Sequence, residues 1–580
     1  MQRLLSEVFG QLDRARRLPW LDLLLIAGLA GLLLAFVDLG REWTGVHRQS
    51  IAIDLSPSAL PRYTMFSLFR GMFAYVISLG FTLVYGYWAA KDRIAGRVLL
   101  PLLDILQSIP VLGFMPGLVL ALVALFPHSN VGLELAAVIM IFTGQAWNMT
   151  FSFVHSLRSI PADLREAATV YRFNWWRRLR NVELPFATLG LVWNSMMSMA
   201  GGWFFLMISE SFQLGERDFR LPGIGSYMSV AVEQGRGDAM VLAILAMVTM
   251  IVVLDQVLWR PVVVWAQKFR VEEGGGGEQI LMHSWFLDWL RGSRLVRWVR
   301  WRLRELRESR ATRDVTRATP APSALPTAVE RNSRAVSFAA LAFLVGVLAW
   351  GGVKLVHLLH EVPAGAWGRS ITAGFITLGR VLLSTLIGTV WALPAGLAIG
   401  LSSRLSRIFQ PIVQVAASFP APMLFPLVIA VLQWAGVTLG WGSILLMLLG
   451  TQWYILFNVI AGAMAIPADL REAATSYRIK GWQRFRRVYF PGVFPYLVTG
   501  WVTATGGAWN ASIVAEFVTF RGQTLRAHGL GAEISGAAAA ANFPLLAAAI
   551  LVMSILVVAF NRTVWRWCYR VAEERFSLSK

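Results

Sequence analysis

The chain has 580 residues, of which 56% are apolar and only 15% are charged, so it is richer in apolar side chains than soluble domains usually are. Its 53 basic and 33 acidic residues give a net charge of +20, but the basic residues lie in short loops between apolar runs. This pattern is typical of a membrane protein and argues against nucleic-acid binding. A single cysteine and seven scattered histidines exclude a disulfide framework and predict no metal site.

Long apolar stretches recur along the chain, and each is near the roughly 20 residues that a helix needs to cross a bilayer. We therefore expect an all-α membrane protein with about 12 membrane-spanning helices. In the first half the predicted spans are 20–37, 68–90, 98–126, 131–155, 188–208 and 239–264. In the second half they are 336–356, 373–400, 408–435, 440–464, 494–514 and 543–565. Because no cleavage site follows the first span, we interpret it as an anchor and not as a signal peptide.

Charge in the loops predicts the orientation. The loop after the fourth span is basic, with Arg158, Arg165, Arg172, Arg177, Arg178 and Arg180. The loop after the fifth span is acidic, with Glu210, Glu216, Asp218, Glu233 and Asp238. Basic loops stay in the cytoplasm, so both termini and the centre of the chain are expected there. We predict a multi-pass protein of the bacterial inner membrane.

The centre of the chain is its one long segment between spans. We predict a first membrane repeat over 1–264, a cytoplasmic linker over 265–335 and a second membrane repeat over 336–580. Gly274–Gly277 indicate a flexible stretch, residues 281–306 a basic amphipathic helix, and residues 316–326 a disordered tether. The helix either lies in the interface against anionic lipid or packs on the protein's own cytoplasmic face, and both readings stay open.

One sequence occurs twice. Residues 160–169 and residues 466–475 both read IPADLREAAT, 306 positions apart. At the same offset the chain pairs Trp147 with Trp453, Tyr171 with Tyr477, Trp176 with Trp482, Pro185 with Pro491, and Glu210 with Glu516. Further upstream the offset drifts, with residues 108–110 matching 418–420. The chain is therefore a tandem duplication of a six-span unit, and its halves should be related by an axis along the membrane normal.

The repeated segment has the chemistry of a short docking helix. Pro161 and Pro467 suit a first helical turn, and the acidic residues that follow lie near the positive end of the helix. Paired alanines give a small face that allows another protein to approach closely. The alternative is an amphipathic loop helix that packs on its own bundle, which duplication alone would also preserve.

The same segment resembles a known family. Glu166–Ala167–Ala168 through Pro185, and Glu472–Ala473–Ala474 through Pro491, resemble the EAA loop of permease subunits of binding-protein-dependent ATP-binding-cassette importers. Trp176 and Trp482 fall where the nitrate, sulfonate and taurine branch commonly has tryptophan. The resemblance implies a type I importer permease fold, with two loops that dock on ATPase subunits. It assigns ATPase coupling to Asp163, Arg165, Glu166, Ala167, Ala168, Arg172, Asp469, Arg471, Glu472, Ala473, Ala474 and Arg478.

The loops depart from the family at one position. Arg172 and Arg478 stand where the family has glycine, and that glycine usually permits the bend between the two short helices. The departure leaves the geometry of the bend as a question for the structure.

The chain contains no G-x-x-x-x-G-K-[ST] phosphate loop, so no catalytic residue is predicted. We expect no cofactor in this chain and ATP with Mg²⁺ in a partner. The resemblance implies two copies of an ATP-binding-cassette ATPase, a periplasmic substrate-binding protein, a small anionic substrate and membrane lipid as partners, and no nucleic acid.

A path for the substrate is expected between the halves. Uncharged amide, hydroxyl and aromatic groups suit an anion that must bind weakly and leave. The candidates are Asn148, Asn194, Ser198, Trp203, Ser209, Asn458, Thr505, Trp509, Asn510 and Ser512. Contacts between helices are the alternative role for each.

The outer ends of the halves carry a second set of paired residues. For Glu210 and Glu516, helix capping and docking of a partner are both open. The glycines that follow, Gly223, Gly225, Gly529 and Gly531, are expected to shape an outer gate.

A secondary transporter of the major facilitator type is the alternative function. It also has six plus six spans and a central loop, and residues 92–97 faintly resemble its D-R-x-G-R loop. That family gives no reason for two REAAT loops.

Overall fold

The computed structural model describes residues 19–45, 51–214, 217–269, 284–293, 296–298, 300–302, 327–520 and 522–576. The chain divides into two compact units. The first comprises Met1–Glu42, Pro161–Val192 and Val253–Leu348, and the second comprises Trp43–Ile160, Trp193–Val252 and Ala349–Lys580. The second unit therefore contains most of the predicted spans of both halves.

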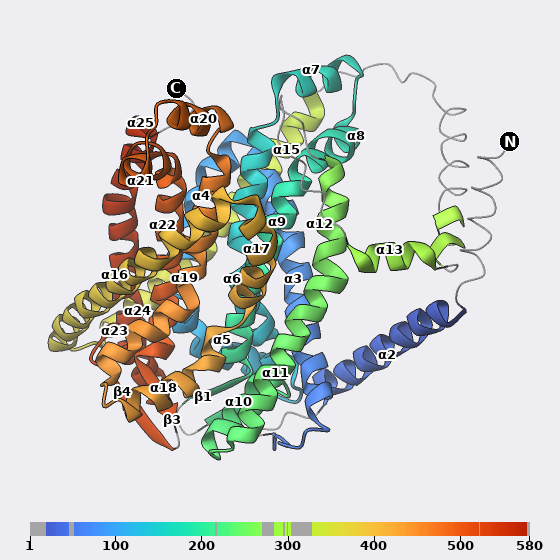
Figure 1. Ribbon diagram of the computed structural model, residues 1–580. Helices are drawn as coiled ribbons and strands as arrows, with labels where there is room; N and C mark the ends of the chain where they lie inside the picture. The colour runs from blue at the N-terminus through green and yellow to red at the C-terminus, as the bar shows by residue number, and fades with distance from the viewer. Residues whose placement is uncertain are drawn as a thin grey trace. The chain divides into compact units, whose positions relative to one another are not determined.

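The elements of the first half are helical apart from one hairpin (Figure 1). They are α2 Pro19–Thr44, α3 Leu60–Lys91, α4 Arg93–Ser108, α5 Val111–Leu125, α6 Val131–Arg158, α7 Ala162–Val170, α8 Trp175–Arg178, the π-helix Leu179–Glu183, α9 Leu184–Ser209, β1 Ser211–Leu214, β2 Arg217–Arg220, α10 Ile224–Glu233, α11 Gly237–Leu254, the π-helix Asp255–Trp259, α12 Arg260–Ala266 and a 3₁₀ turn Gln267–Phe269.

The linker region and the second half follow. Their elements are α13 Trp285–Gly292, α15 Thr327–Leu359, α16 Ala364–Leu401, α17 Ser403–Ser418, a 3₁₀ turn Ala421–Leu424, α18 Phe425–Trp434, α19 Leu439–Ala465, α20 Ala468–Ser476, α21 Gly481–Arg484, the π-helix Phe485–Tyr489, α22 Phe490–Ala515, β3 Phe517–Phe520, β4 Gln523–Arg526, α23 Leu530–Ala539, α24 Phe543–Phe560, the π-helix Asn561–Trp565 and α25 Arg566–Arg575.

The two halves repeat the same order of elements, including details that hydropathy does not reveal. The π-helix at Leu179–Glu183 has its counterpart at Phe485–Tyr489, exactly one repeat later, and a second pair begins at Asp255 and Asn561. Each half also has one antiparallel hairpin, with Ser211 opposite Arg220 and Phe517 opposite Arg526. The predicted all-α membrane fold with an internal duplication is confirmed, and the two short hairpins are an addition to it.

Two of the roughly 12 predicted spans are bent pairs of helices. Among the described residues, nine helices are long and apolar enough to cross a membrane, and two bent helix pairs raise the number to 11 if each pair is one span. The predicted spans 98–126 and 408–435 are these pairs, bent by 97° and 82°. The bend falls at Pro110 and Pro420, because a residue that precedes proline is pushed out of the helical conformation. The stretch 494–514 lies in α22, which is not among the nine helices.

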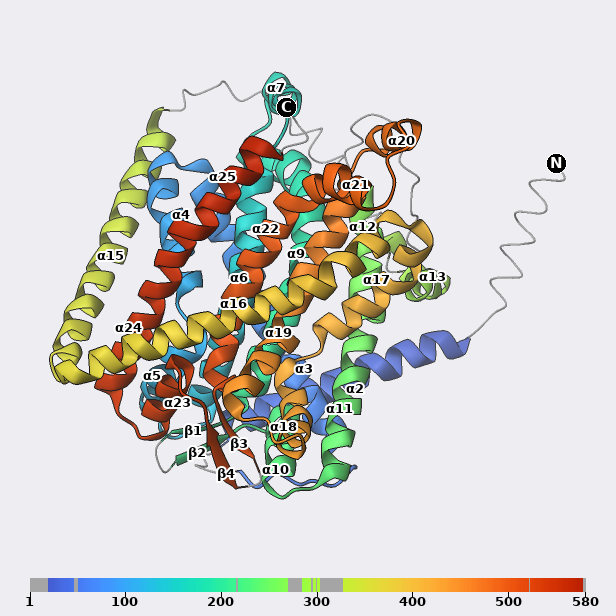
Figure 2. The same ribbon diagram turned by 60° about the vertical axis from the view of Figure 1, so that its left-hand side comes forward.

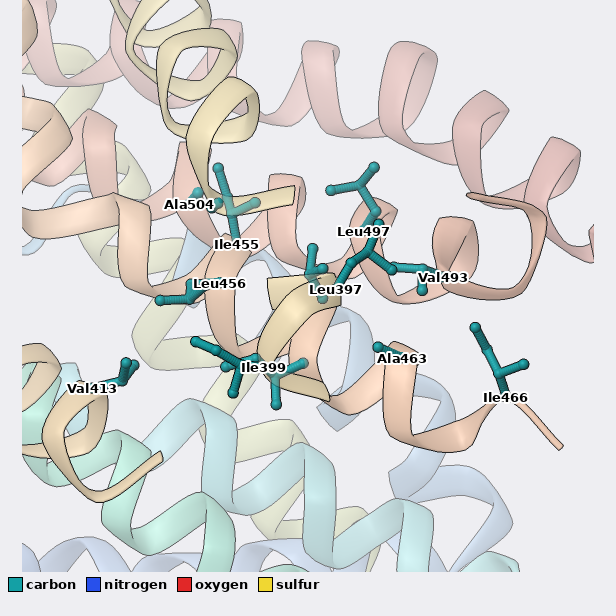
Figure 3. Packing of buried hydrophobic residues seen from close by; sticks show 13 residues of the cluster. Leu397, Ile399, Val413, Ile455, Leu456, Ala463, Ile466, Val493, Leu497 and Ala504 are labelled. Carbon is teal, nitrogen blue, oxygen red and sulfur yellow. The ribbon is translucent and has the colours of Figure 1, made fainter. Parts of the chain in front are cut away.

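The core of the second half lies where α16, α19 and α22 meet, and Figure 2 shows these helices side by side. Ile455 and Leu456 of α19 belong to one buried cluster with Leu497 of α22 and Leu397 of α16 (Figure 3). Gly396 lets α16 approach closely, since a Cβ there would lie 2.6 Å from Val459 Cγ1. Small residues at such crossings are the usual device of membrane helix packing.

Only part of the predicted linker can be compared with the structure, because Gly274–Gly277, part of residues 281–306 and all of 316–326 lie outside the described residues. The described part includes α13, where the Ser284 hydroxyl caps the helix by accepting from the amide of Leu287. Trp285 Nε1 donates to Gln256 Oε1 at 3.0 Å, within the same unit. The domain boundaries and the role of this segment stay predictions.

Candidate functional site

Each EAA-like loop folds as helix, bend, helix. In the first unit α7 is followed by α8, and in the second unit α20 is followed by α21. Both first helices begin after an extended proline, Pro161 with ψ 147° and Pro467 with ψ 144°. Proline has no amide hydrogen to lose and its fixed φ suits this position. The ten identical residues therefore build the same helix start twice.

The bend that follows is a Schellman motif in both loops. The amide of Phe173 donates to the carbonyl of Ala168 at 2.9 Å, and the amide of Arg172 donates to the carbonyl of Thr169 at 3.0 Å. In the second loop Ile479 donates to Ala474 at 2.9 Å and Arg478 to Thr475 at 3.0 Å. These bonds satisfy the carbonyls that the end of a helix leaves without partners.

The residue at the centre of the motif is the arginine that replaces the family glycine. Arg172 has φ 49° and Arg478 has φ 52°, both in the left-handed region that glycine favours. The bend is thus retained without glycine, at a backbone cost of about 1 to 2 kcal/mol for each arginine. The structure therefore shows that the bend between the two short helices forms with arginine at this position.

The loops differ in what they expose. The structure exposes most of the predicted coupling residues, namely Asp163, Arg165, Glu166, Ala167, Arg172, Asp469, Glu472, Ala473 and Arg478, whereas Arg471 is half-buried and Ala168 and Ala474 are buried. Tyr171, Trp175 and Trp176 add exposed rings to the first loop, as Tyr477 and Trp482 do to the second. Arg178 pairs with Glu183 at 3.0 Å in the first loop, whereas Arg484 Nη2 donates to the carbonyl of Arg471 at 3.2 Å in the second.

A cavity of about 240 Å³ lies inside the second unit, between helices of the two halves. Its walls come from the bends of both bent helix pairs, from α6 and α19, and from α9 and α22. The main lining residues are Gln107, Val111, Thr143, Trp147, Asn148, Phe204, Phe419, Thr451, Trp453, Tyr454, Trp509 and Asn510. None of the described residues that line it carries a charge. Aromatic faces with a few amide and hydroxyl groups are typical of a small-molecule site.

Three of the ten predicted path residues line this cavity, namely Asn148, Trp509 and Asn510. Asn510 also joins the halves, because its Oδ1 accepts from the amide of Val111 at 2.8 Å. Its counterpart one repeat earlier is Phe204, which also lines the cavity, so the two sides differ.

The other seven do not line the cavity, and six of them make contacts within or between helices. Asn194 donates to Ser152, Asn458 to the carbonyl of Tyr454, Thr505 to that of Trp501, Ser209 to that of Leu206 and Ser512 to that of Trp509, while Trp203 packs on Gly71. The Ser198 hydroxyl is buried without a partner among the described residues.

A second cavity, of about 330 Å³, lies at the hairpin ends of both halves. Its lining includes Met207 and Met228 from the first half and Ile513 and Ile534 from the second. The glycine-containing turns that were expected to shape an outer gate are at this level, and Gly225 itself lines the cavity.

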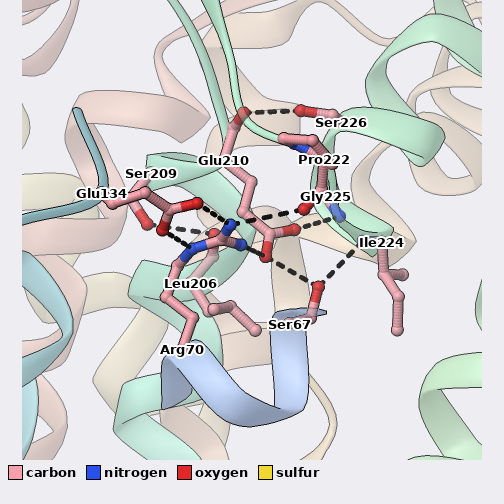
Figure 4. A network of polar contacts seen from close by, with 10 residues as sticks. All are labelled: Ser67, Arg70, Glu134, Leu206, Ser209, Glu210, Pro222, Ile224, Gly225 and Ser226. Atoms are coloured by element: carbon pink, nitrogen blue, oxygen red, sulfur yellow. Dashed lines mark hydrogen bonds and ion pairs between the residues drawn. The ribbon is translucent and has the colours of Figure 1, made fainter. Parts of the chain in front are cut away.

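A buried ionic network holds the first of these turns (Figure 4). Arg70 of α3 donates through Nε and Nη2 to both oxygens of Glu134, each at 2.7 Å, and through Nη1 to Glu210. The side chains of Arg70, Glu134 and Glu210 are wholly buried. Such a group of charges persists because every member is paired and hydrogen-bonded.

Glu210 in turn binds the start of α10. Its Oε2 accepts from the amide of Gly225 at 2.7 Å and its Oε1 from the hydroxyl of Ser67 at 2.7 Å. A Cβ at Gly225 would lie 2.7 Å from the carbonyl oxygen of Met207, so the turn requires glycine there. Of the two roles that the sequence left open for Glu210, the structure shows capping of a helix start.

The second half repeats this arrangement with Glu516. Arg380 Nη1 donates to Glu516 Oε1 at 2.7 Å, Thr377 donates to the same carboxylate at 3.0 Å, and the amide of Gly531 donates at 2.9 Å. Sequence reasoning missed Arg70, Glu134 and Arg380. The signal was present, because ionisable residues inside apolar spans are rare and are usually paired.

Comparisons with known proteins agree with the duplicated fold. The chain is 27% identical over 143 residues to the nitrate import permease protein of Leptolyngbya laminosa, a match that covers 25% of this chain and 50% of the relative. It is 26% identical over 201 residues to a putative ABC transporter permease protein of Methanocaldococcus jannaschii, covering 34% and 70%. It is 23% identical over 192 residues to the taurine transport system permease protein of Escherichia coli K12, covering 33% and 68%.

The matched part of the chain spans about half the length of the first of these relatives. These relatives are named as transport components, and none supports the alternative of a major facilitator carrier. The model of the family described as binding-protein-dependent transport system inner membrane component matches residues 82–258 and 384–567, one match in each half. The two matches together cover more than half of the chain, and the protein therefore belongs to this family.

Proposed function

We propose that this chain forms the translocation path of an ATP-driven importer for a small anionic solute of the sulfonate, sulfate ester, taurine or nitrate class. Two copies of an ATP-binding-cassette ATPase dock on its two EAA-like loops, and these partners bind ATP and Mg²⁺. A periplasmic substrate-binding protein delivers the solute. The names of the nitrate and taurine relatives support the class of solute.

The observation that carries the proposal is the shared geometry of the two loops. Both loops have the same helix start, the same Schellman bend and the same arginine in the left-handed conformation. Both expose the acidic residues of the first helix. Two surfaces with the same backbone geometry suit two copies of one partner, each of which takes a short helix into a groove.

The cavity between the halves supports the transport of an anion. Its amide and hydroxyl groups can hydrogen-bond a small anion, while the lack of a lining cation among the described residues keeps binding weak enough for release. When the partner ATPases close, the loops would move with them and the halves would rock about this cavity.

The test is a reversal of charge at the docking helices. Glu166→Lys and Glu472→Lys put the wrong charge at a helix start and on the exposed face. Each single variant should weaken, and the double variant should abolish, the ATP hydrolysis that a nitrate- or taurine-loaded binding protein stimulates in the reconstituted complex. Glu574→Lys is the matched control, because it makes the same change on the exposed face of α25. A double variant with the control's activity would refute the proposal.

A further inference from the structure

The buried networks of the two halves match at three positions and differ at a fourth. Ser67 corresponds to Thr377, Arg70 to Arg380 and Glu210 to Glu516, and each set makes the same bonds to the helix start that follows. The fourth member of the first network is Glu134. At the offset of 306 that pairs Trp147 with Trp453 on the same helices, its counterpart is Gly440.

Because Gly440 has no carboxylate, the unused edge of the Arg380 guanidinium, its Nη2 side, has no carboxylate partner among the described residues. All three nitrogens of the Arg70 guanidinium have carboxylate partners, and its side chain is 0% exposed. Arg380 bonds through Nη1 to Glu516, the only partner that the described residues give its guanidinium, and its side chain is 12% exposed. Glu516 is therefore the one counter-ion of Arg380 among the described residues, whereas Arg70 has two, Glu134 and Glu210.

The unused edge faces Gly440. A Cβ at Gly440 would lie 3.5 Å from Arg380 Nη2 and 3.8 Å from Thr438 Oγ1, which is ordinary contact distance. Nη2 is one of the two nitrogens through which Arg70 holds Glu134. Thr438 is the N-cap of α19, but its side chain makes no capping hydrogen bond. The Thr438 hydroxyl therefore accepts from none of the first amides of this helix.

We propose that the Arg380 edge, Thr438 and the first turn of α19 form a site for one carboxylate, sulfonate or phosphate group. That group would take the place that the Glu134 carboxylate has in the first half. Guanidinium binds such groups through two parallel hydrogen bonds, and a helix start adds amides and a favourable dipole. This site rests on the comparison of the two halves and not on the proposed transport function.

Two sources could supply the group. Trp434 and Trp441, beside the site in the sequence, are 89% and 67% exposed, and such rings are common at the level of lipid headgroups. A lipid phosphate is therefore one source, and a free anion from outside is the other.

The experiment fills the site with a side chain of the protein itself. Gly440→Glu supplies a carboxylate to Arg380, and Gly440→Ala adds only the Cβ and serves as the control. The purified full chain is titrated with methanesulfonate and with inorganic phosphate while its thermal unfolding is followed. In a second arm it is purified with phosphatidylglycerol or phosphatidylcholine, and retained lipid is counted by native mass spectrometry.

We expect the parent chain and Gly440→Ala to respond in at least one arm, and Gly440→Glu to respond roughly tenfold more weakly there, because a charge-assisted bond is lost to the ligand. A response to the soluble anions alone identifies a solute site, and retention of phosphatidylglycerol alone identifies a lipid site. Arg380→Lys, which can keep the pair with Glu516 but loses the planar edge, should weaken the same response if Gly440→Glu fails to fold. No response in either arm, or an equal response in all variants, would overturn the proposal.

Discussion

Arg172 and Arg478 hold the same left-handed backbone conformation at positions that are 306 residues apart, with φ 49° and φ 52°. Each is the turning residue of a Schellman motif. The two loops thus keep one geometry with a residue that adopts it only under strain.

The strain predicts a stabilising substitution. Arg172→Gly or Arg478→Gly should raise the free energy of unfolding by roughly 1 kcal/mol, because glycine reaches positive φ without a clash. The temperature of unfolding of the purified chain measures this. Arg478→Ala is the control, since it removes the same side chain and keeps the Cβ. If the glycine variant were no more stable than the alanine variant, the strain would not be present.

The duplication and most helices could be predicted from the sequence, because the IPADLREAAT segments match exactly and the apolar runs are long. The bends at Pro110 and Pro420 could not be predicted in the same way, since hydropathy averaged over a span takes proline as one more uncharged residue. The four-residue strands are too short to give an alternating pattern.

The candidate site was predicted less completely than the fold. Asn148, Trp509 and Asn510 line the cavity, but so do Trp147 and Tyr454, which had no assigned role in the path. Hydropathy says which segments are apolar, whereas the cavity depends on how the helices rotate against one another. The buried network joins Arg70 to Glu134 and Glu210, which lie 64 and 140 positions further along the chain. Only the presence of ionisable groups inside predicted spans could have indicated it.

The buried network of the first half should be the more sensitive to loss of its arginine. Arg70→Ala leaves two buried carboxylates without their cation and should cost at least about 3 to 5 kcal/mol. Arg380→Ala leaves one carboxylate beside a partly exposed position and should cost less. The yield of folded protein and its unfolding temperature compare the two. A larger loss for Arg380→Ala would contradict the difference between the halves.

Replacement of glycine by alanine in the turns after the hairpins should destabilise the protein. Gly225→Ala places a Cβ 2.7 Å from the carbonyl oxygen of Met207, and the equivalent Gly531→Ala meets the carbonyl of Ser512. Both should lower the unfolding temperature. Gly379→Ala, where a Cβ meets nothing within 4 Å, should be neutral or stabilising because alanine favours a helix. Equal effects at all three positions would show that the turns are not tightly packed.

The orientation predicted from loop charge can be tested by the accessibility of single loops from outside. A cysteine at Asp238, exposed beyond α10, should react with an impermeant thiol reagent in intact spheroplasts, whereas a cysteine at the exposed Arg177 should not. Cys568 is buried, so the background reaction should be low. Labelling at Arg177 and not at Asp238 would reverse the topology.

The central claim is that one chain presents two equivalent docking loops. The most direct measurement is the mass of the active complex purified with its ATPase partner, determined by native mass spectrometry. We predict two ATPase subunits for each copy of this chain, falling to one in the complex of a single Glu166→Lys or Glu472→Lys variant under dilute conditions. An active complex that contains one ATPase subunit for each chain, or no ATPase at all, would contradict the account.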